Sequence, residues 1–477
     1  MSGPRFFNIT FVVLLICTCA YGANWQGMVN RNKNALITLR YYAPYKLNNE
    51  NIGTFFATGT IVDKEKGIVL ADRETTQVSP AVITGYLQNY EEIELKTIYY
   101  DPIHNFAFLQ FDPHKVKWSD IGEIKLGDSD DVKLGDAIVL LSTTKNKNLG
   151  VVHGNIVDII ELKRRNDFKY QDYNINYFDT SLVSVNEGGG IILNEKGEAI
   201  ALHAWIHEAD PFDYSKDKNF YAELPINFIK DVLSDLKKGK PIQRGDLGLV
   251  LNFLTFSQAL EFKVPNDSID AARKKTKSKG LLYISSVVGS TPNDDKFKVG
   301  DIILKINGQY IGDKYLILEK MLDENVGKRI DVTIYRNEKP LNIKAGVFDL
   351  LKTKTNGFAL FSGGVFQDIP WFIKVKTNVG NRGVYVSSYG NGSPLSCANF
   401  FENNVITNIN GVEINNLGDF YNVIKLFKHD MLMRIRYVDL VLNNKEYVRT
   451  FRVNSKFFPT RFFTKGNKDG DWHEIKR

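Results

Sequence analysis

Residues 184–202 read SVNEGGGIILNEKGEAIAL, in which a glycine run leads directly into an apolar segment. Residues 191–193 have the aliphatic, β-branched composition of a buried strand, and residues 199–202 form a second apolar run. The four residues between the two runs, Asn-Glu-Lys-Gly, are typical of a turn. The stretch therefore predicts a β-hairpin preceded by a glycine loop, and the chemistry of that loop decides what the protein can do.

Other short strands are expected on the N-terminal side of this hairpin. ALITLRYY (35–42), FFATGTIVD (55–63), GIVLAD (67–72) and AIVLLS (137–142) are β-branched or aromatic runs separated by turn-forming residues. Close spacing of such runs without a long helical period predicts an all-β barrel or sandwich up to about residue 224. An amphipathic helix is expected after residue 226, because one helical face carries Phe228, Ile229, Val232, Leu233 and Leu236.

The C-terminal half contains a repeat of about 100 residues. GLLYISSVVGS, beginning at Gly280, is followed by GDIILKING, and GVYVSSYGNGS, beginning at Gly383, is followed by NVITNING. The two ING turns lie 103 residues apart, as do Gly280 and Gly383. Each copy continues with a helical pattern (315–322 or 417–427) and a closing strand (330–336 or 433–438). Two copies of one small α+β domain are therefore predicted.

Each copy resembles the PDZ domain, and two such copies after a β-rich domain resemble the HtrA (DegP-like) serine proteases. ATGTIVDKEKGIVLADR (57–73), YDPIHNFAFLQFDP (100–113) and LDENVGKRIDVTIYR (322–336) resemble the fungal nuclear branch of that family, whose members carry two protease-plus-PDZ halves. This chain is similar to one half. The resemblance implies a mostly β fold, with a trypsin-like double β-barrel followed by two PDZ-like α+β domains. The expected boundaries are 30–238 for the double barrel, 245–347 and 355–460 for the PDZ-like domains, and 461–477 for a basic C-terminal tail.

The family cleaves peptide bonds with a His–Asp–Ser triad, and all three positions differ in this chain. The resemblance puts Glu74 at the histidine position, Asn105 at the aspartate position and Gly190 at the serine position. Gly190 offers no nucleophile, and Asn105 has no negative charge to stabilise a histidinium. Because loss of a triad costs about 10⁶ in turnover, we expect a pseudoprotease. The loop of Gly188, Gly189 and Gly190 is either an oxyanion-loop remnant that binds a carbonyl or carboxylate, or a turn without function.

Several other polar residues near these positions are candidates for chemistry. His104 is expected to point away from the old site, because successive strand residues face opposite ways. The hydroxyl of Ser181 is expected to bond to the backbone. His203, His207 and Glu208 lack a further histidine or cysteine at ligand spacing, so a polar rim is expected there and no metal site. No cofactor is expected.

A PDZ-like groove needs a sheet edge, a backbone nest for a carboxylate and an apolar pocket, and none of these requires a reactive side chain. The candidate peptide-binding residues are Leu247, Gly248, Leu249 and Val250 in the first unit, and Gly363, Gly364, Val365 and Phe366 in the second. The expected ligands are polypeptide segments or protein C-termini, with internal extended segments as an alternative. For the second unit, a purely structural role packed against the protease-like domain is equally expected.

Charge and the N-terminus limit the partners and the location. The net charge of +6, from 61 basic and 55 acidic side chains, gives no reason to expect a nucleic acid partner. Residues 1–22 have the apolar run and small residues of a cleaved signal peptide, which predicts the secretory pathway or an extracellular location. An uncleaved signal that anchors the protein to a membrane is the alternative.

Together these features predict an HtrA-like pseudoprotease that binds extended or unfolded polypeptides as an adaptor, a chaperone or a regulator of an active HtrA-like paralogue. Two alternatives stay open. One is a serine-type endopeptidase with residual or unconventional activity, and the other is a purely structural subunit of an HtrA-like assembly. The resemblance also implies a homo-oligomer, as a trimer.

Overall fold

The computed structural model describes residues 25–76, 78–162, 168–183, 188–208, 218–377, 379–466 and 470–475. The expected signal peptide, 1–22, lies outside this part of the chain. Among the described residues, no helix combines the length and the apolar composition that a membrane crossing requires. A short helix, α1 (Trp25–Asn32), precedes the first strand.

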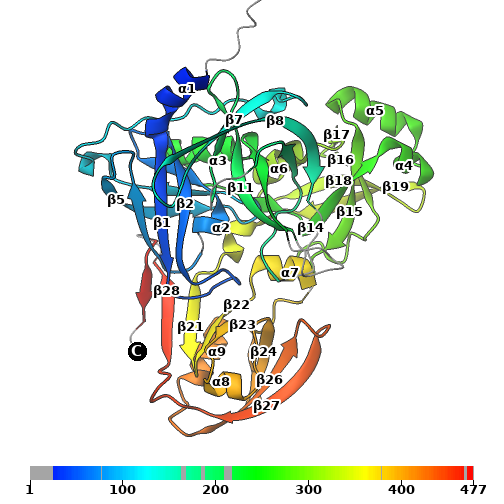
Figure 1. Cartoon of the computed structure of the whole chain (residues 1–477). Helices are drawn as coiled ribbons and strands as arrows, with labels where there is room; N and C mark the ends of the chain where they lie inside the picture. Colours follow the sequence, from blue (N-terminus) through cyan, green and yellow to red (C-terminus); the bar gives the residue numbers. More distant parts are fainter. Residues whose placement is uncertain are drawn as a thin grey trace, which may run out of the picture.

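Two closed six-stranded barrels make up the N-terminal half, as the predicted trypsin-like fold requires (Figure 1). The strand order is β1-β2-β3-β6-β5-β4 in the first barrel and β10-β11-β12-β9-β8-β7 in the second. The predicted hairpin is confirmed, because Ile191 of β10 pairs with Leu202 of β11. The first barrel comprises β1 (Leu36–Ala43), β2 (Gly53–Asp63), β3 (Ile68–Ala71), β4 (Val82–Tyr86), β5 (Glu92–Tyr100) and β6 (Ala107–Gln110). The second comprises β7 (Ala137–Thr143), β8 (Leu149–Glu161), β9 (Asn176–Thr180), β10 (Ile191–Leu193), β11 (Ala199–Glu208) and β12 (Lys218–Pro225).

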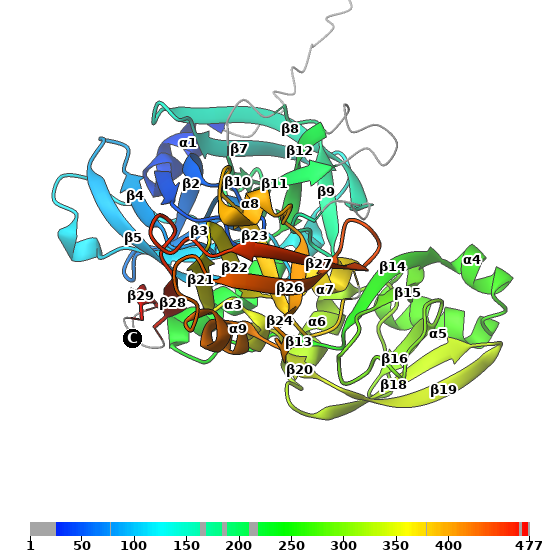
Figure 2. The same cartoon turned by 90° about the horizontal axis from the view of Figure 1, so that it is seen from below.

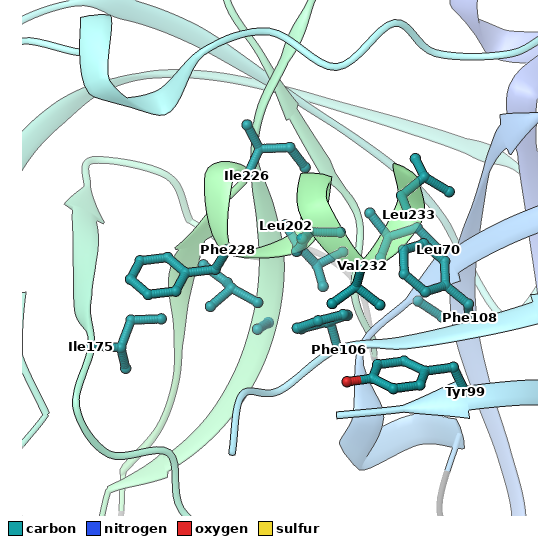
Figure 3. Close-up of a cluster of buried hydrophobic side chains, with 14 of the residues drawn as sticks. Leu70, Tyr99, Phe106, Phe108, Ile175, Leu202, Ile226, Phe228, Val232 and Leu233 are labelled. Carbon is teal, nitrogen blue, oxygen red and sulfur yellow. The ribbon is translucent and has the colours of Figure 1, made fainter. Parts of the chain in front are cut away.

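Helix α3 (Asn227–Lys238) joins the two barrels through its apolar face. Figure 3 shows Val232 of this helix close to Phe106 of the first barrel and Leu202 of the second, and Phe228 beside Ile175. All five side chains are buried in one continuous core. Because burying each such side chain contributes roughly 1.5–3 kcal/mol, this face holds the barrels together. The helix ends at Gly239, whose φ of +64° suits a glycine at that position.

The first PDZ-like domain is an open sheet of order β14-β15-β16-β18-β19, in which β14 is an edge strand. Helix α6 (Tyr315–Asp323) follows the predicted ING turn. Two helices that the sequence did not predict, α4 (Phe256–Glu261) and α5 (Asn266–Thr276), lie between β14 and β15. The strands are β14 (Leu249–Thr255), β15 (Gly280–Val287), β16 (Ile302–Ile306), β17 (Gln309–Tyr310), β18 (Arg329–Arg336) and β19 (Lys339–Gly346). A separate two-stranded sheet pairs β13 (Gly245–Asp246) with β20 (Phe348–Asp349).

The second PDZ-like domain repeats this strand order and extends it. Its sheet runs β27-β26-β24-β23-β22-β21-β28-β29, so that β22 has the place that β14 has in the first copy. Figure 2 shows this domain from below, beside the first PDZ-like domain. The strands are β21 (Gly357–Phe361), β22 (Gly364–Asp368), β23 (Val384–Tyr389), β24 (Asn404–Ile409), β25 (Val412–Glu413), β26 (Leu432–Asp439), β27 (Lys445–Arg452), β28 (Arg461–Lys465) and β29 (Trp472–Glu474). The helices are α7 (Trp371–Thr377), α8 (Pro394–Cys397) and α9 (Leu417–Ile424).

Part of the segment that was expected to be a basic tail, 461–477, belongs to this sheet instead. Strand β28 pairs with β21, and β29 pairs with β28. The ring of Phe463 stacks on that of Phe358, with centroids 4.6 Å apart, and both rings are buried. The guanidinium of Arg461 donates two hydrogen bonds of 2.9 Å to the Glu474 carboxylate. The basic composition of this segment gives no sign of the two strands, because burial of its aromatic side chains decides where it packs.

Candidate functional site

The three positions that the resemblance assigns to the catalytic triad are divided between the two barrels. Glu74 is on the short helix α2 (Arg73–Thr76), and its side chain is outside the described part of the structure. Asn105 is buried between β5 and β6, and its N–H donates to Asp172 Oδ2 at 2.7 Å. Gly190 immediately precedes β10 in the second barrel. The two barrels meet at the glycine loop, because Thr58 N–H of β2 donates to the Gly188 carbonyl at 3.0 Å.

Gly190 lacks a nucleophile, and the surrounding atoms leave no room for one. Its φ is +153°, and a Cβ on it would lie 2.6 Å from Leu140 Cδ1 and 2.9 Å from the Leu141 carbonyl oxygen. Its own carbonyl accepts a hydrogen bond of 3.0 Å from His203 N–H. Contacts under 3.0 Å require the neighbours to move, and a backbone carbonyl in a closed barrel moves at a high cost.

Gly189 is equally confined. Its φ is +65°, and a Cβ there would lie 2.8 Å from Asp72 Oδ2, just before helix α2. Only glycine adopts this left-handed backbone at little cost. The loop of Gly188, Gly189 and Gly190 is thus fitted closely between the barrels as a backbone element.

The other residues that the sequence offered as candidates for chemistry have structural contacts. His203 is 2 % exposed, and its Nδ1 lies 2.9 Å from Glu223 Oε2. The expectation of a polar rim is therefore wrong for His203, because β11 points this side chain into the second barrel. His207 and Glu208 carry side chains outside the described part. The backbone bond predicted for Ser181 is confirmed, because its hydroxyl accepts from Asn155 N–H at 2.9 Å. The described residues hold no group of three or more His, Cys, Asp or Glu that could bind a metal ion.

A buried charge cluster, which the sequence did not predict, links the first barrel to the first PDZ-like domain. Arg244, whose side chain is 1 % exposed, lies 3.0 Å from Asp101 Oδ2, 2.5 Å from Glu319 Oε1 and 3.0 Å from Asp323 Oδ2. His104 points away from the glycine loop and into this cluster, with Nε2 2.6 Å from Glu319 Oε2. Asp101 and His104 come from the barrel, whereas Glu319 and Asp323 come from helix α6. The cluster therefore fixes the first PDZ-like domain on the barrel.

The pKa values of the cluster follow from burial and charge. Burial opposes ionisation of Glu319, but the charges of Arg244 and His104 outweigh it and lower the pKa of that carboxyl to about 2. Burial also acts on Asp323 and, together with the nearby charge of Glu319, raises its pKa to about 7. Burial disfavours the His104 imidazolium, yet the Glu319 carboxylate raises the pKa of His104. The cluster is held together by Arg244 as its central cation.

In the first PDZ-like domain, side chains of the second barrel already occupy the edge of β14. Asn174 Nδ2 donates to the Leu249 carbonyl at 2.9 Å, and Leu251 N–H donates to Asn174 Oδ1 at 2.7 Å. Phe253 N–H donates to Glu161 Oε1 at 2.8 Å. These are the main-chain groups that an added peptide strand would pair with. The cavity that remains beside them measures about 60 Å³, which leaves no space for a peptide.

The candidate carboxylate loop of this domain is filled by a carboxylate of the chain itself. Asp246 accepts a hydrogen bond from Gly248 N–H, and the Tyr173 hydroxyl donates to Asp246 Oδ2 at 3.0 Å. The side chain is 3 % exposed, and burial raises the pKa of Asp246 to about 6, although these two donors favour the charged form. We call Glu161, Asn174 and Asp246 the groove latch.

In the second PDZ-like domain, the corresponding sheet edge is covered by a strand and not by side chains of the barrel. Strand β21 pairs with β22 along the edge that corresponds to the latched edge of β14. Ser362 and Gly363, at φ +49° and +84°, form the two-residue turn between β21 and β22. The candidate residues Gly363, Gly364, Val365 and Phe366 thus lie in a hairpin rather than in an open carboxylate loop. Phe361 of β21 packs edge-on against Phe420 of α9, so β21 fills the space between β22 and α9.

Two protein-family matches agree with the double barrel and the first PDZ-like domain. Residues 57–202 match the trypsin-like peptidase domain family, and residues 270–347 match the PDZ domain family. "Pro-apoptotic serine protease NMA111" of Vanderwaltozyma polyspora is 26% identical over 456 residues, which cover 94% of this chain and 44% of that protein. "Protease Do-like 7" of Arabidopsis thaliana is 25% identical over 472 residues, covering 95% of this chain and 42% of that protein. The chain thus spans less than half the length of these curated relatives. Among solved structures, "HtrA-type protease AlgW with tripeptide" has a TM-score of 0.48 and 18% identity over 68% of this chain and 97% of that chain.

Proposed function

Because this chain is an HtrA-like protein, with a trypsin-like double barrel followed by a PDZ domain, we propose that it binds polypeptide without cutting it. One observation carries the proposal. The nucleophile position is Gly190, where φ is +153° and a Cβ would lie 2.9 Å from the backbone carbonyl oxygen of Leu141. Acyl transfer needs a nucleophile and a base within hydrogen-bond reach, and this backbone accepts neither a serine nor a cysteine at that point. Polypeptide bound in this way would be presented to, or withheld from, an active HtrA-like paralogue.

We place the polypeptide site in the first PDZ-like domain. Its edge strand is covered by the side chains of Asn174 and Glu161. Once this edge separates from the second barrel, a peptide strand can replace their hydrogen bonds one for one. A terminal carboxylate can likewise replace Asp246 in its loop. The second PDZ-like domain differs, because β21 is joined to β22 through a tight turn and is flanked by β28. That groove cannot open unless the β21–β22 pairing breaks and β21 leaves with β28, which favours a structural role for this domain.

The first prediction concerns restoration of the triad. We expect the variant with Glu74→His, Asn105→Asp and Gly190→Ser to remain inactive. The Cβ of the introduced serine has no room, and the introduced carboxylate would be buried beside Asp172. The measurement is hydrolysis of fluorescent casein and labelling by a fluorophosphonate serine probe, with an active HtrA protease as the positive control. The unmodified chain should also give no turnover. Casein hydrolysis by the unmodified chain would instead support the endopeptidase alternative.

Binding is tested with reduced, carboxymethylated α-lactalbumin, which is an unfolded polypeptide. We expect saturable binding by fluorescence anisotropy, with the polypeptide recovered intact. The absence of binding would leave the third possibility, a purely structural subunit.

The pKa of Asp246 sets the sign of the pH dependence. In the latched state its pKa is about 6, whereas an Asp that a ligand has displaced into water has a pKa of about 3.9. Protonation stabilises the state in which Asp246 has the higher pKa, and this is the state in which Asp246 still fills its loop. Polypeptide binding should therefore weaken by about tenfold as the pH falls from 7 to 5. The titration is repeated with Asp246→Asn, which should remove this dependence. Equal binding by the unmodified chain at both pH values would mean that the ligand does not displace Asp246.

A further inference from the structure

A cleft of about 1010 Å³ lies apart from both PDZ-like grooves, against the first barrel. One wall is strand β5 of the barrel. The other is formed by Lys354 and Asn356, just before β21, and by Lys465, the last residue of β28, and Gly470, between β28 and β29. Figure 1 shows β21 and β28 side by side as they approach the barrel. The cleft is large enough for a ligand the size of a short peptide.

Three cations gather around one tyrosine ring at this cleft. Lys354 Nζ lies 4.3 Å from the centroid of the Tyr100 ring and 4.5 Å from that of Tyr99. Lys465 Nζ and the guanidinium carbon of Arg73 each lie 5.7 Å from the Tyr100 centroid. The tyrosine faces attract these cations, but they do not neutralise them. The arrangement concentrates positive charge at one end of a solvent-filled space.

In the part of the chain that is described, neither Lys354 nor Lys465 forms an ion pair that would balance this charge, although both line the cleft and are partly exposed. Asp471, a nearby acid of the C-terminal segment, pairs with Lys96 at 2.8 Å, and its charge only partly offsets the burial that lowers the pKa of Lys465. Burial, with repulsion from Lys465 and Arg73, outweighs the attraction of the Asp101 carboxylate and lowers the pKa of Lys354 to about 7. A bound anion would reverse this shift, because an opposite charge favours the protonated amine.

The rest of the lining decides which kind of anion fits. The remaining charged lining is mixed, because four acids (Glu65, Glu92, Glu94 and Asp112) alternate with three lysines (Lys66, Lys96 and Lys115). A polymer with negative charge along its whole length matches such a lining poorly. A polypeptide fits this lining better, because it can place one carboxylate at Lys354 and Lys465 and neutral or basic groups beside the acidic side chains. We propose that this cleft binds a carboxylate group of a polypeptide, held by Lys354 and Lys465. The inference rests on the proposed function, for which it supplies a polypeptide contact outside the PDZ-like grooves.

The anion site is tested first without any polypeptide. The probe is sodium glutarate, exchanged for sodium chloride at constant ionic strength, and the readout is the rate of trace acetylation of each lysine by mass spectrometry. Glutarate should slow acetylation of Lys354 and Lys465 severalfold, because it shields and protonates their amines. Lys352 and Lys445 are exposed and serve as internal controls; Lys445 also lies over a tyrosine ring, at 5.4 Å from the Tyr447 centroid. Equal rates in glutarate and chloride at the two cleft lysines would overturn the anion site.

The polypeptide is tested second, with carboxymethylated α-lactalbumin on the full chain. The variant Lys354→Met/Lys465→Met should bind it at least about tenfold more weakly, and the control Lys352→Met/Lys445→Met should bind it as the unmodified chain does. Thermal melting checks that both variants are folded. Protection by glutarate with unchanged polypeptide binding would exclude a polypeptide as the ligand. If no chain binds the polypeptide, the proposed function fails and the polypeptide assignment fails with it, while the glutarate result still reports on the anion site.

Discussion

Arg244→Met is expected to lower the free energy of unfolding by roughly 3–5 kcal/mol, the cost of removing one partner from a buried ion pair. The loss should be this large because Asp101, Glu319 and Asp323 all lie within 3.0 Å of the guanidinium. Without it, the buried carboxyl group of Asp101 faces the partly exposed carboxyl groups of Glu319 and Asp323 across a domain boundary. Urea denaturation measures the change, and limited proteolysis should show that the first PDZ-like domain has become separable from the barrels.

The matched control is Lys263→Met, which removes one partner of the exposed Lys263–Glu338 pair of 2.5 Å. Exposed pairs contribute about 0–1 kcal/mol, so this variant should unfold almost as the unmodified chain does. If both variants lost the same free energy, the cluster around Arg244 would have no special role in joining the domains.

Removal of the side chains that cover β14 should strengthen polypeptide binding. The Glu161→Ala/Asn174→Ala variant loses three hydrogen bonds to Leu249, Leu251 and Phe253. Each such bond contributes about 0.5–1.5 kcal/mol net, so a larger fraction of molecules should have an open edge. Binding of carboxymethylated α-lactalbumin should become roughly tenfold to a hundredfold tighter, as measured by fluorescence anisotropy.

Asn342→Ala is the control for this variant. Asn342 lies on β19, the opposite edge of the same sheet, where its side chain accepts a hydrogen bond of 2.8 Å from the Thr333 hydroxyl. Binding should be unchanged in this variant. Unchanged or weaker binding in the Glu161→Ala/Asn174→Ala variant itself would show that β14 is not the polypeptide edge.

The parts of the fold that the sequence predicted depend on local patterns. The β10–β11 hairpin follows from two apolar runs around a turn, and helix α3 follows from apolar residues at helical spacing that do become buried. The two PDZ-like domains follow from the 103-residue repeat. For the hairpin and the helix the signal lies within a few dozen residues, where the periodicity of side chains reports directly on burial. The repeat is recognised because one such set of local patterns occurs twice.

The site was predicted less completely, because its contacts join distant segments. The motif around Gly190 marks the position that the resemblance assigns to the nucleophile, but nothing in the sequence pairs it with Leu140. Similarly, Asn174 and Leu251 have no common motif, and a buried cation such as Arg244 has no periodicity. One local signal was available: Ser362-Gly363 between two apolar runs is a two-residue hairpin signature, which would have predicted the β21–β22 turn.

The pairing of β21 with β28 has a consequence for how the chain is made. Both barrels are complete once residue 225 has been synthesised, so they can fold while the ribosome is still translating the rest. The outer side of β21, in contrast, stays uncovered until residues 461–465 have emerged, about 100 residues after β21 itself. During that interval an unpaired strand edge is exposed on the nascent protein, and chaperones or a rapid rate of elongation must protect it from pairing with a neighbouring chain.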